Sequence, residues 1–324
     1  MAMIGPLGFV VIGRNEGERL AACLQSLPEG SPVVYVDSGS TDGSPDRARG
    51  LGAEVVELTT DKPFSAARGR NEGFACLIEH NPGLEYVHFI DGDCTLAEGW
   101  VEKAWAALHE ASDIAAVCGQ RRERFPDANI LHSLAEREWN TPVGVAESCG
   151  GDVLFRREAF EQGGGYNPGL IAGEEPELCV RVREKGWRIM RIDADMTWHD
   201  IALQSLKPFW TRAARAGHAF AEVSDLHKAS PKRIWAKETK RALLWASFVP
   251  GLIVLALIIS PIFLLGLLIY PLQVLRVGRS LGGKDAYAHA ALYVFGRFPE
   301  AWGVLRYWRK RLTGRPNAVM DYKS

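Results

Sequence analysis

The sequence predicts an α/β fold, with a mostly parallel sheet that carries helices on both faces, followed by a C-terminal helical hairpin and an amphipathic helix. The first observation is that short β-branched runs alternate with helical stretches from residue 8 to about residue 120. This alternation is typical of parallel sheets whose crossover connections are helices. The second observation is a long uncharged run in the last third of the chain, which is typical of membrane segments.

The expected strands are short apolar runs at residues 9–12, 33–36, 54–58, 86–90 and 114–117. The expected helices alternate with them, at residues 18–26, 45–52, 65–80 and 98–110. Residues 121–225 carry glycine-rich turn signals and are expected to complete the sheet. Ligands of such sheets bind beyond the carboxyl ends of the strands, so polar clusters at those ends are the first candidates for a functional site.

The uncharged run covers residues 242–275, which contain no Asp, Glu, Lys, Arg or His. One spanning helix needs about 20 apolar residues, so the run is either one long tilted span or two short helices hinged near Ser260-Pro261. Cytoplasmic flanks of membrane segments are rich in lysine and arginine, and this run has such residues on both sides. The flanks therefore favour a transmembrane or re-entrant hairpin with both ends in the cytoplasm. The basic residues are Lys228, Lys232, Arg233, Lys237, Lys240 and Arg241 before the run, and Arg276, Arg279 and Lys284 after it.

Residues 286–311 are expected to form an amphipathic helix. Aromatic and basic side chains together suit a helix that lies in the headgroup region of an anionic membrane. The alternative is a helix that packs on the folded domain. The apolar residues at helical spacing are Leu292, Phe295, Phe298, Trp302, Leu305 and Trp308.

The composition narrows the class of protein and its compartment. The net charge of −1 excludes a general nucleic-acid binder. The six cysteines form no CxxC pair, so most are expected to be small buried residues in a reducing compartment. No basic stretch precedes the first apolar run, as it would in a secretion signal. We therefore expect the globular part to stay in the cytoplasm.

The strongest chemical signal is Asp91-Gly92-Asp93, directly after the apolar run 86–90. Mg²⁺ and Mn²⁺ prefer oxygen ligands and often bind one or two carboxylates together with substrate phosphates. The glycine lets the backbone turn tightly and approach a ligand. An isolated Asp-x-Asp is also a common structural turn, but its place at a strand end predicts a divalent metal site.

Polar residues also follow two earlier strands and begin a later helix. Asn15 and Glu16 come after the first strand, and Asp37 comes after the second, too early to cap the next helix and where a base or ribose would lie. Arg68 and Arg70 put two guanidinium groups close together, and arginine suits bidentate binding of phosphate. The alternative for the arginines is a solvated helix face.

Four motifs in this order closely resemble those of family 2 glycosyltransferases with the GT-A fold, over about residues 8–225. The resemblance implies an inverting enzyme that uses a nucleotide-diphosphate sugar and Mn²⁺ or Mg²⁺. The motifs are Gly13-Arg14-Asn15-Glu16, Asp37-Ser38-Gly39-Ser40-Thr41-Asp42, Ala67-Arg68-Gly69-Arg70-Asn71 and Asp91-Gly92-Asp93.

The resemblance also implies roles for single residues. It assigns metal binding to Asp93, with Asp91 beside it and His199, which follows the strand-like residues 188–192, as a further ligand. It assigns contacts with the nucleotide to several residues of the first three motifs and to Asp91. These are Asn15, Glu16 and Asp37 for the nucleoside, and Arg68, Arg70 and Asn71 near the diphosphate.

Two later segments resemble the acceptor half of the same family. Gly151 and Asp152 lie in a segment similar to the one that lines the sugar and acceptor cleft. Residues 173–178 resemble the Gly-Glu-Asp-x-Glu-Leu motif, in which the aspartate is the usual catalytic base. Here that position is Glu175, a departure that moves the carboxylate one methylene further out. Glu174 is the rival candidate for the base.

The membrane segment makes a lipid or lipid-linked saccharide the expected acceptor, in polysaccharide or glycolipid assembly. The Gln-x-x-Arg-Trp motif of polymerising synthases is missing from the sequence, which favours addition of one or a few sugars. One alternative is a nucleotidyltransferase acting on a sugar phosphate, although the glycine-rich basic loop expected after its first strand is missing. The other is a non-catalytic, membrane-bound scaffold.

The expected organisation has four parts. Residues 1–227 form the glycosyltransferase domain, and 228–241 form a basic juxtamembrane linker. Residues 242–277 form the membrane segment, and 278–324 an interfacial region that contacts membrane lipids. This order places the protein at the cytoplasmic face of the inner membrane, as an integral or monotopic protein.

Overall fold

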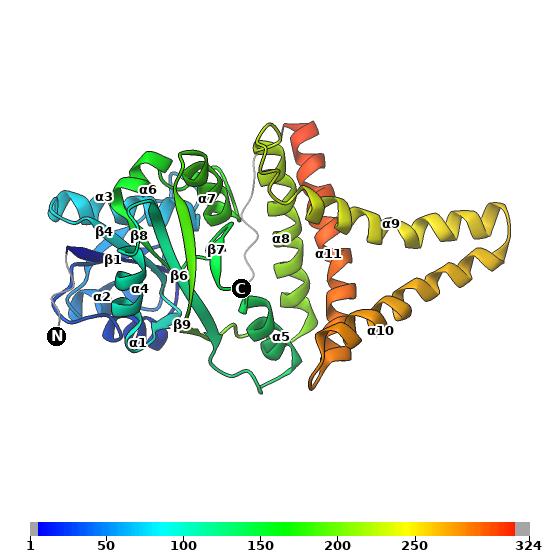
Figure 1. The fold of residues 1–324 in the computed structure, drawn as a ribbon, viewed down its shortest axis with the longest axis horizontal. Coiled ribbons are helices and arrows are strands. Elements are labelled where there is room, and N and C mark those ends of the chain that lie inside the picture. The colour runs from blue at the N-terminus through cyan, green and yellow to red at the C-terminus, as the bar shows by residue number, and fades with distance from the viewer. Residues whose placement is uncertain (1–5, 315–324) are drawn as a thin grey trace. The chain divides into compact units, whose positions relative to one another are not determined.

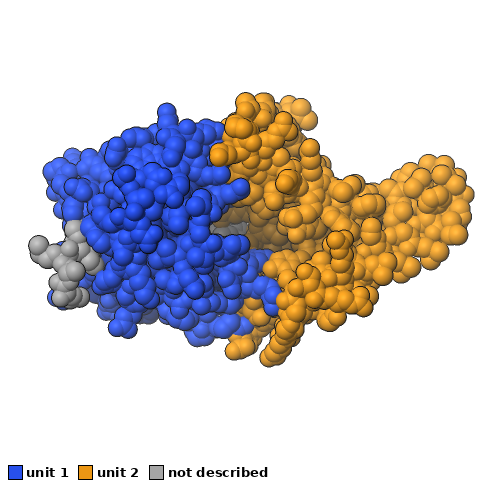
Figure 2. All heavy atoms as spheres, viewed as in Figure 1, with its two compact units in different colours: residues 1–126, 135–201 blue, residues 127–134, 202–324 orange. Residues whose placement is uncertain are grey.

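The structure is a computed structural model that describes residues 6–314 of the 324. Parts of two expected segments, residues 1–5 and 315–324, lie outside the described residues. The chain divides into two compact units (Figure 2). Unit 1 comprises residues 1–126 and 135–201, and unit 2 comprises residues 127–134 and 202–324. The boundary of the functional domain near residue 227 stays a prediction, because compact packing does not define where an activity ends.

Unit 1 is built on a mixed, largely parallel sheet, which confirms the predicted α/β fold (Figure 1). The strand order in the described residues is β3-β2-β1-β4-β8-β6-β9-β5, with β7 beside β9. The strands are β1 (Leu7–Gly13), β2 (Val33–Asp37), β3 (Glu54–Glu57), β4 (Tyr86–Asp91), β5 (Cys94–Leu96), β6 (Ile114–Glu123), β7 (Gly144–Ala146), β8 (Val153–Arg156) and β9 (Arg188–His199).

The parallel strands bring the predicted polar strand ends to one edge. In the register of β1 with its neighbours, Gly13 lies opposite Asp37 on β2, and Ile12 lies opposite Asp91 on β4. The carboxyl ends of β1, β2 and β4 therefore lie side by side at the same edge of the sheet. Because β8 runs antiparallel to β4, the chain that enters β8 lies at the same edge.

The helices expected in the first 120 residues all form, with ends displaced by one or two residues. The predicted start at residue 98 moves to Trp100, because Gly99 has a left-handed backbone (φ 71°) and serves as the helix N-cap. The helices of unit 1 are α1 (Glu18–Gln25), α2 (Ser44–Gly50), α3 (Ala66–His80), α4 (Trp100–Leu108), α6 (Arg157–Gly163) and α7 (Glu174–Glu184), and α5 (Ile130–Trp139) spans the division between the units.

Helix α3 packs closely on β1 and β2 because it presents glycine to them. A Cβ at Gly73 would lie 2.5 Å from Val10 Cγ1 and 2.7 Å from Val36 Cγ2. A Cβ at Gly69 would lie 3.4 Å from Ile12 Cγ2. This close approach holds the start of α3, including Arg70, over the carboxyl edge of the sheet.

The last strand of unit 1 is longer than predicted. The sequence indicated a strand at residues 188–192 with His199 after it, whereas β9 continues to His199. The cause is non-local pairing, since β6 also continues to Glu123 and its last residue pairs with His199. Register shifts after Cys118 and around Gln120 interrupt this pairing.

Unit 2 is helical in its described residues. The uncharged run forms two helical segments that meet at Ser260-Pro261 and return from a common tip (Figure 1), as the predicted hairpin does. Two helices, Ala236–Ile258 and Pro261–Leu281, are long and apolar enough to cross a membrane. The elements are α8 (Leu206–Leu226), α9 (Ala236–Ile258), η1 (Pro261–Leu268), α10 (Ile269–Leu281) and α11 (Ala286–Thr313).

Helix α11 packs on α8, as the alternative of a helix on the folded protein expected, and its place in a membrane interface stays a prediction. One face packs on α8 with the backbones almost touching, since a Cβ at Gly303 would lie 1.9 Å from Ala214 O. Phe295 of the predicted apolar set packs on Phe209. Three other members of the set remain exposed: Trp302, Leu305 and Trp308.

Candidate active site

The Asp91-Gly92-Asp93 turn crosses the end of β1. Strand β4 ends at Asp91 and β5 begins at Cys94. The Gly92 N–H donates to Ile12 O at 2.8 Å, and a Cβ at Gly92 would lie 3.1 Å from that oxygen. Glycine is needed here because the two backbones approach closely. The turn is therefore fixed against the sheet, with one carboxylate on each side of the glycine.

Asp91 lies between two arginines. Its Oδ1 is 2.8 Å from Arg70 Nη2, and its Oδ2 is 3.2 Å from Arg121 Nη2. Both oxygens thus face guanidinium groups of the protein. Arg121 comes from β6, just after the register shifts, and bulges commonly redirect side chains beside active sites. The charge of Asp91 is therefore balanced by arginines of the protein, and the metal ligation expected of it stays a prediction.

Arg70 joins this turn to the predicted base. Its Nη1 is 2.9 Å from Glu174 Oε1 and 3.1 Å from Glu175 Oε1, while Nη2 binds Asp91. The side chain is only 2% exposed, and its guanidinium lies over the ring of Tyr166. The structure therefore brings the two acidic motifs to one buried cation. The predicted contact of Arg70 with a diphosphate stays a prediction, because three carboxylates already surround the guanidinium.

The acid pair begins helix α7. Gly173 precedes it with a left-handed backbone (φ 82°), and the N-terminus of a helix favours negative charge. Burial, and then the neighbouring Glu174, raise the pKa of Glu175 to about 7, while Arg70 acts in the opposite direction. Glu175 is also the more accessible of the two side chains, at 16% against 7%. A carboxylate that titrates near neutral pH is suited to accept a proton from a hydroxyl.

Gly151 and Asp152 contact the residues of the Asp91-Gly92-Asp93 turn and its partner Arg70. Asp152 is fully buried and accepts hydrogen bonds from Asp91 N at 3.0 Å, Thr197 Oγ1 at 2.7 Å and Arg121 Nε at 3.0 Å. Burial alone would raise its pKa, but Arg121 and the hydrogen bonds hold the pKa of Asp152 below its ordinary value. A Cβ at Gly151 would lie 2.3 Å from the Arg70 guanidinium. Direct contact of these residues with a sugar stays a prediction.

Asp93 and His199, the predicted metal ligands, lie close together. Strand β5 pairs antiparallel with β9, with Cys94 opposite His199. This pairing places Asp93 Oδ2 3.4 Å from His199 Nε2. Adjacent ligands of one octahedral cation, bound at about 2.1 Å, stand about 3 Å apart, so a modest shift would let both bind one ion. A carboxylate and an imidazole suit Mn²⁺ better than Mg²⁺.

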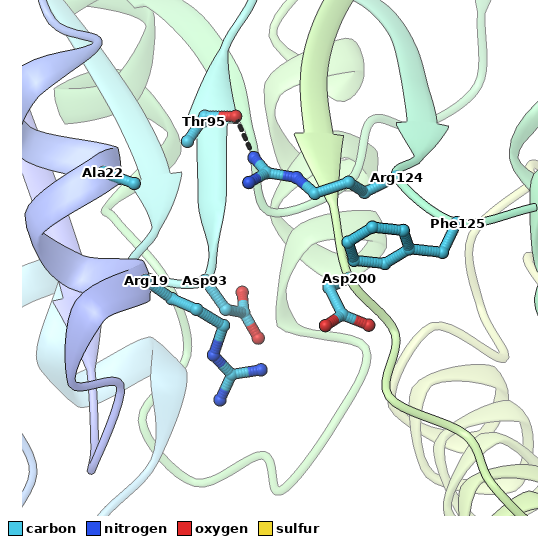
Figure 3. A pocket seen from close by; sticks show the side chains of 7 residues that line it. All are labelled: Arg19, Ala22, Asp93, Thr95, Arg124, Phe125 and Asp200. Carbon is cyan, nitrogen blue, oxygen red and sulfur yellow. Dashed lines mark hydrogen bonds between the residues drawn. The ribbon is translucent and has the colours of Figure 1, made fainter. Parts of the chain in front are cut away.

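A cavity of about 230 Å³ opens beside Asp93. Figure 3 shows the side chains of Asp93, Arg19 and Asp200 directed toward a common space, with the Arg124 guanidinium bonded to the Thr95 hydroxyl. Two guanidinium groups beside a candidate metal ligand suit an anionic group. The seven lining residues are Arg19, Ala22, Asp93, Thr95, Arg124, Phe125 and Asp200.

Three arginines of this site, Arg19, Arg121 and Arg124, are not among the residues predicted from the sequence. Arg121 and Arg124 belong to a basic stretch that follows the apolar start of β6, and this stretch was the available signal. Arg19 lies in the first turn of α1 and forms an ion pair of 2.7 Å with Glu16, one of the predicted nucleoside contacts. Glu16 is therefore connected to the cavity by its ion pair with Arg19, which lines the cavity wall.

Asn15 joins the loop after β1 to the loop after β2, and Asp37 shapes the second of these loops. The Asn15 N–H donates to Ser40 Oγ at 2.8 Å, and Asn15 Oδ1 accepts from the Thr41 N–H at 2.7 Å. Asp37 is 2% exposed, and its Oδ2 accepts from the N–H groups of Gly39 and Ser40. Both residues thus shape the loops after β1 and β2, and their contact with a nucleoside stays a prediction.

Arg68 and Asn71 face different partners from Arg70. Arg68 Nη1 donates to the backbone oxygens of Thr59 and Lys62, at 3.0 and 2.9 Å. Asn71 exchanges two hydrogen bonds with the backbone of Tyr166. Residues two apart on a helix lie on different faces, so the guanidinium groups of Arg68 and Arg70 have separate surroundings. The nucleotide contacts expected of Arg68 and Asn71 stay predictions.

A largely parallel α/β sheet with an Asp-Gly-Asp turn at its carboxyl edge and an acid pair at a nearby helix start defines a GT-A type glycosyltransferase. Residues 9–164 match the model of the family described as glycosyl transferase family 2. The matched residues are a little under half of the chain and include all four motifs, so the match supports the resemblance to this family.

Curated relatives are similar to the chain over about two thirds of its length. The succinoglycan biosynthesis protein ExoA of Rhizobium meliloti is 27% identical over 235 residues, which cover 67% of this chain and 69% of that protein. The pre-mycofactocin glycosyltransferase of Mycobacterium tuberculosis is 27% identical over 233 residues, or 67% of this chain. The match spans about half, 47%, of that second relative.

Solved structures share the fold at low identity. The mannosyltransferase PcManGT from Pyrobaculum calidifontis, in complex with GDP-Man and Mn²⁺, superposes with a TM-score of 0.64 at 17% identity, covering 94% of this chain and 88% of that one. TarS 1-349 of S. aureus superposes with a TM-score of 0.51 at 15% identity, covering 95% and 92%. These similarities show that the fold is shared.

Proposed function

We propose that the protein transfers a sugar, with inversion, from a nucleotide-diphosphate sugar to a membrane-proximal, lipid-linked acceptor in polysaccharide or glycolipid assembly. The observation that carries this proposal is the buried Arg70, which ties the Asp-Gly-Asp turn to Glu174 and Glu175. An inverting transfer needs a charged donor site and a separate base within one small volume. The network of Arg70 supports that combination.

Glu175 is the proposed base. In an inverting displacement a carboxylate takes the proton of the acceptor hydroxyl as its oxygen attacks the anomeric carbon, opposite the departing diphosphate. The pKa of about 7 keeps a sizeable fraction of Glu175 ionised and ready at neutral pH. Glu174, more buried and directly paired with Arg70, is the proposed partner that keeps this pKa high.

Asp93 and His199 are the proposed ligands of a divalent cation, Mn²⁺ or Mg²⁺. When bound, such an ion stabilises the negative charge that develops on the leaving diphosphate. The structurally similar PcManGT was obtained with GDP-Man and Mn²⁺, which supports a divalent ion here. Arg19 and Arg124 line the same cavity, and we propose that they approach the diphosphate from the protein side.

The relatives and the hydrophobic helices support the proposed setting. ExoA is named for succinoglycan biosynthesis, and an O-antigen chain rhamnosyltransferase of Salmonella anatum is 22% identical over 174 residues. Two helices of unit 2 are long and apolar enough to cross a membrane. A membrane-bound acceptor at the cytoplasmic face of the inner membrane accounts for both observations.

The test uses the full chain in detergent, with a panel of nucleotide-sugars and lipid extracts as acceptor. The expected result is release of nucleoside diphosphate that needs lipid, requires Mn²⁺ or Mg²⁺ and stops with chelator. The product's anomeric configuration should be opposite to that of the donor. A parallel assay supplies a nucleoside triphosphate and a sugar 1-phosphate instead, and release of pyrophosphate there would identify a nucleotidyltransferase. Absence of turnover with every donor would favour the non-catalytic scaffold.

A further inference from the structure

A second group of metal-ligating side chains lies at the far end of α3, away from the candidate active site. It consists of Glu54, Cys76 and His80, whose carboxylate, thiol and imidazole donor atoms all lie within 4.8 Å of one another. Cys76 is six residues beyond Arg70, or about 9 Å further along the helix axis at 1.5 Å per residue. We propose that these three side chains bind a divalent transition-metal cation of the zinc class, independently of sugar transfer.

The distances fit a single tetrahedral ion. His80 Nδ1 is 2.9 Å from Glu54 Oε1, and Cys76 Sγ is 3.7 Å from the same nitrogen. Around one Zn²⁺, with metal–ligand bonds of about 2.0–2.3 Å, neighbouring ligand atoms stand about 3.4–3.6 Å apart. The observed separations bracket these values, so small side-chain rotations bring all three donors to one ion.

The elements that carry the three ligands account for their meeting. Cys76 and His80 are four residues apart on α3, the spacing that places two side chains on one helix face. Glu54 is the first residue of β3, the edge strand of the sheet. A bound ion would therefore fasten the short edge strand to the helix that covers it. Three protein ligands also leave a fourth position for water.

The ligand chemistry selects the class of metal. Thiolate and imidazole are ligands for zinc and similar transition metals and not for Mg²⁺. Burial, and then Glu54, raise the pKa of the Cys76 thiol to about 11, so the free site holds the thiol proton. Binding of a dication releases that proton to solvent and forms the metal–sulfur bond. The side chains of Glu54 and His80 are 41% and 53% exposed, which gives an ion direct access.

Cobalt(II) reports on this site because a thiolate ligand produces near-ultraviolet charge-transfer absorption. The full chain in detergent, reduced and stripped of metal, is titrated with Co²⁺ without oxygen. Wild type and Asp93→Ala should both show the thiolate band, saturating at one equivalent. Cys76→Ser should lose it, and His80→Ala should need at least about tenfold more Co²⁺.

Two results would overturn the proposal. One is a wild-type protein without the band, and the other is a band that survives Cys76→Ser. A band lost in Asp93→Ala would also count against it, because it would assign the thiolate to Cys94 beside the active site. A second measurement guards against misfolding. In the Asp93→Ala background, Zn²⁺ should raise the Tm of the protein with Cys76 and leave that of the protein with Cys76→Ser unchanged, while wild type and the single variant Cys76→Ser transfer sugar equally with Mn²⁺.

Discussion

Arg70 shows how much one buried side chain can organise. It is 2% exposed and lies within 3.1 Å of oxygens from Asp91, Glu174 and Glu175. Removing one partner of a buried ion pair commonly costs about 3–5 kcal/mol, because the other charge is left uncompensated. Arg70 thus stabilises a concentration of negative charge that would otherwise repel itself.

The pH dependence of transfer should report on Glu175. The base acts when ionised, and its pKa is raised to about 7, so kcat/KM should rise with pH up to about 7 and then level off. Below that value, activity should fall about tenfold per pH unit. Glu175→Gln should lower kcat by about 10²–10⁴-fold. The measurement is a pH–rate profile at saturating metal, with Glu184→Gln at the exposed end of α7 as control. A wild-type profile that is flat between pH 5 and 8 would contradict the assignment.

Metal dependence should separate Asp93 from Asp91. Asp93 and His199 face each other at 3.4 Å, whereas both oxygens of Asp91 face arginines. Asp93→Ala should abolish metal-dependent transfer. His199→Ala should raise the Mn²⁺ concentration for half-maximal activity by at least about tenfold. Asp91→Asn should lower stability while leaving that concentration nearly unchanged. A large change in the Mn²⁺ concentration that Asp91→Asn needs for half-maximal activity would instead identify Asp91 as a metal ligand.

At the scale of elements, the site depends on how closely neighbouring segments approach. Helix α3 reaches the sheet because Gly73 faces Val10 and Val36. The register shifts between β6 and β9 come directly before Arg121, whose guanidinium pairs with Asp91. The turn before β8 approaches Arg70 so closely that only glycine fits at residue 151. Each contact joins segments that are distant in the sequence.

Two adjacent glycines allow a direct test of that closeness. In Gly151→Ala the new Cβ would lie 2.3 Å from Arg70 Nη2 and 3.1 Å from Asp91 Oδ2. This overpacking should cost about 1–3 kcal/mol and sharply reduce transfer. Gly150→Ala is the matched control, because nothing lies within 4 Å of its Cβ. The Tm and the turnover rate should both be lower in Gly151→Ala than in Gly150→Ala. Equal values in the two variants would show that Arg70 and Asp91 can move aside without loss of stability or activity.

The contact between α8 and α11 allows a similar comparison in unit 2. Gly303→Ala would place a Cβ 1.9 Å from Ala214 O, so the helices must separate and the free energy of unfolding should fall by about 1–3 kcal/mol. Gly296→Ala, on the same helix, meets only Phe209 Cζ at 3.7 Å. It should be neutral or stabilising by up to about 1 kcal/mol, since alanine favours helix. Thermal unfolding in detergent measures both, and a Gly303→Ala protein as stable as wild type would argue against this packing.

At the scale of the whole molecule, the chain consists of a compact α/β unit and a helical unit (Figure 2). The helical unit carries the two apolar helices, and few of their side chains are covered by the rest of the protein. Exposed apolar surface of this extent is typical of a membrane or protein interaction surface. A bilayer is the environment that the length of the helices fits.

Membrane attachment predicts a definite extraction behaviour. After cell lysis, the protein should stay in the membrane pellet through high salt and alkaline carbonate, and detergent should release it. The reason is that the hydrophobic effect would hold the helices Ala236–Ile258 and Pro261–Leu281 in the bilayer. Salt and the loss of lipid-surface charge do not weaken that interaction. Immunoblotting of the fractions measures the outcome. Release by carbonate alone would show that the helices are covered by protein instead.

The sequence by itself determined the first four strands, the first four helices, the Asp-Gly-Asp turn and the apolar helical hairpin, because hydrophobic periodicity and turn residues act over a few neighbours. It also placed Asp93 and Glu175 in the motifs through which the site is recognised. Only the tertiary structure decided that Arg70 joins Asp91 to the acid pair, and that Arg121 balances Asp91 from β6. It also continued β9 to His199 through pairing with β6. The physical reason is that a buried charge is paired by whichever side chain the folded chain brings to it, and no local pattern encodes that partner.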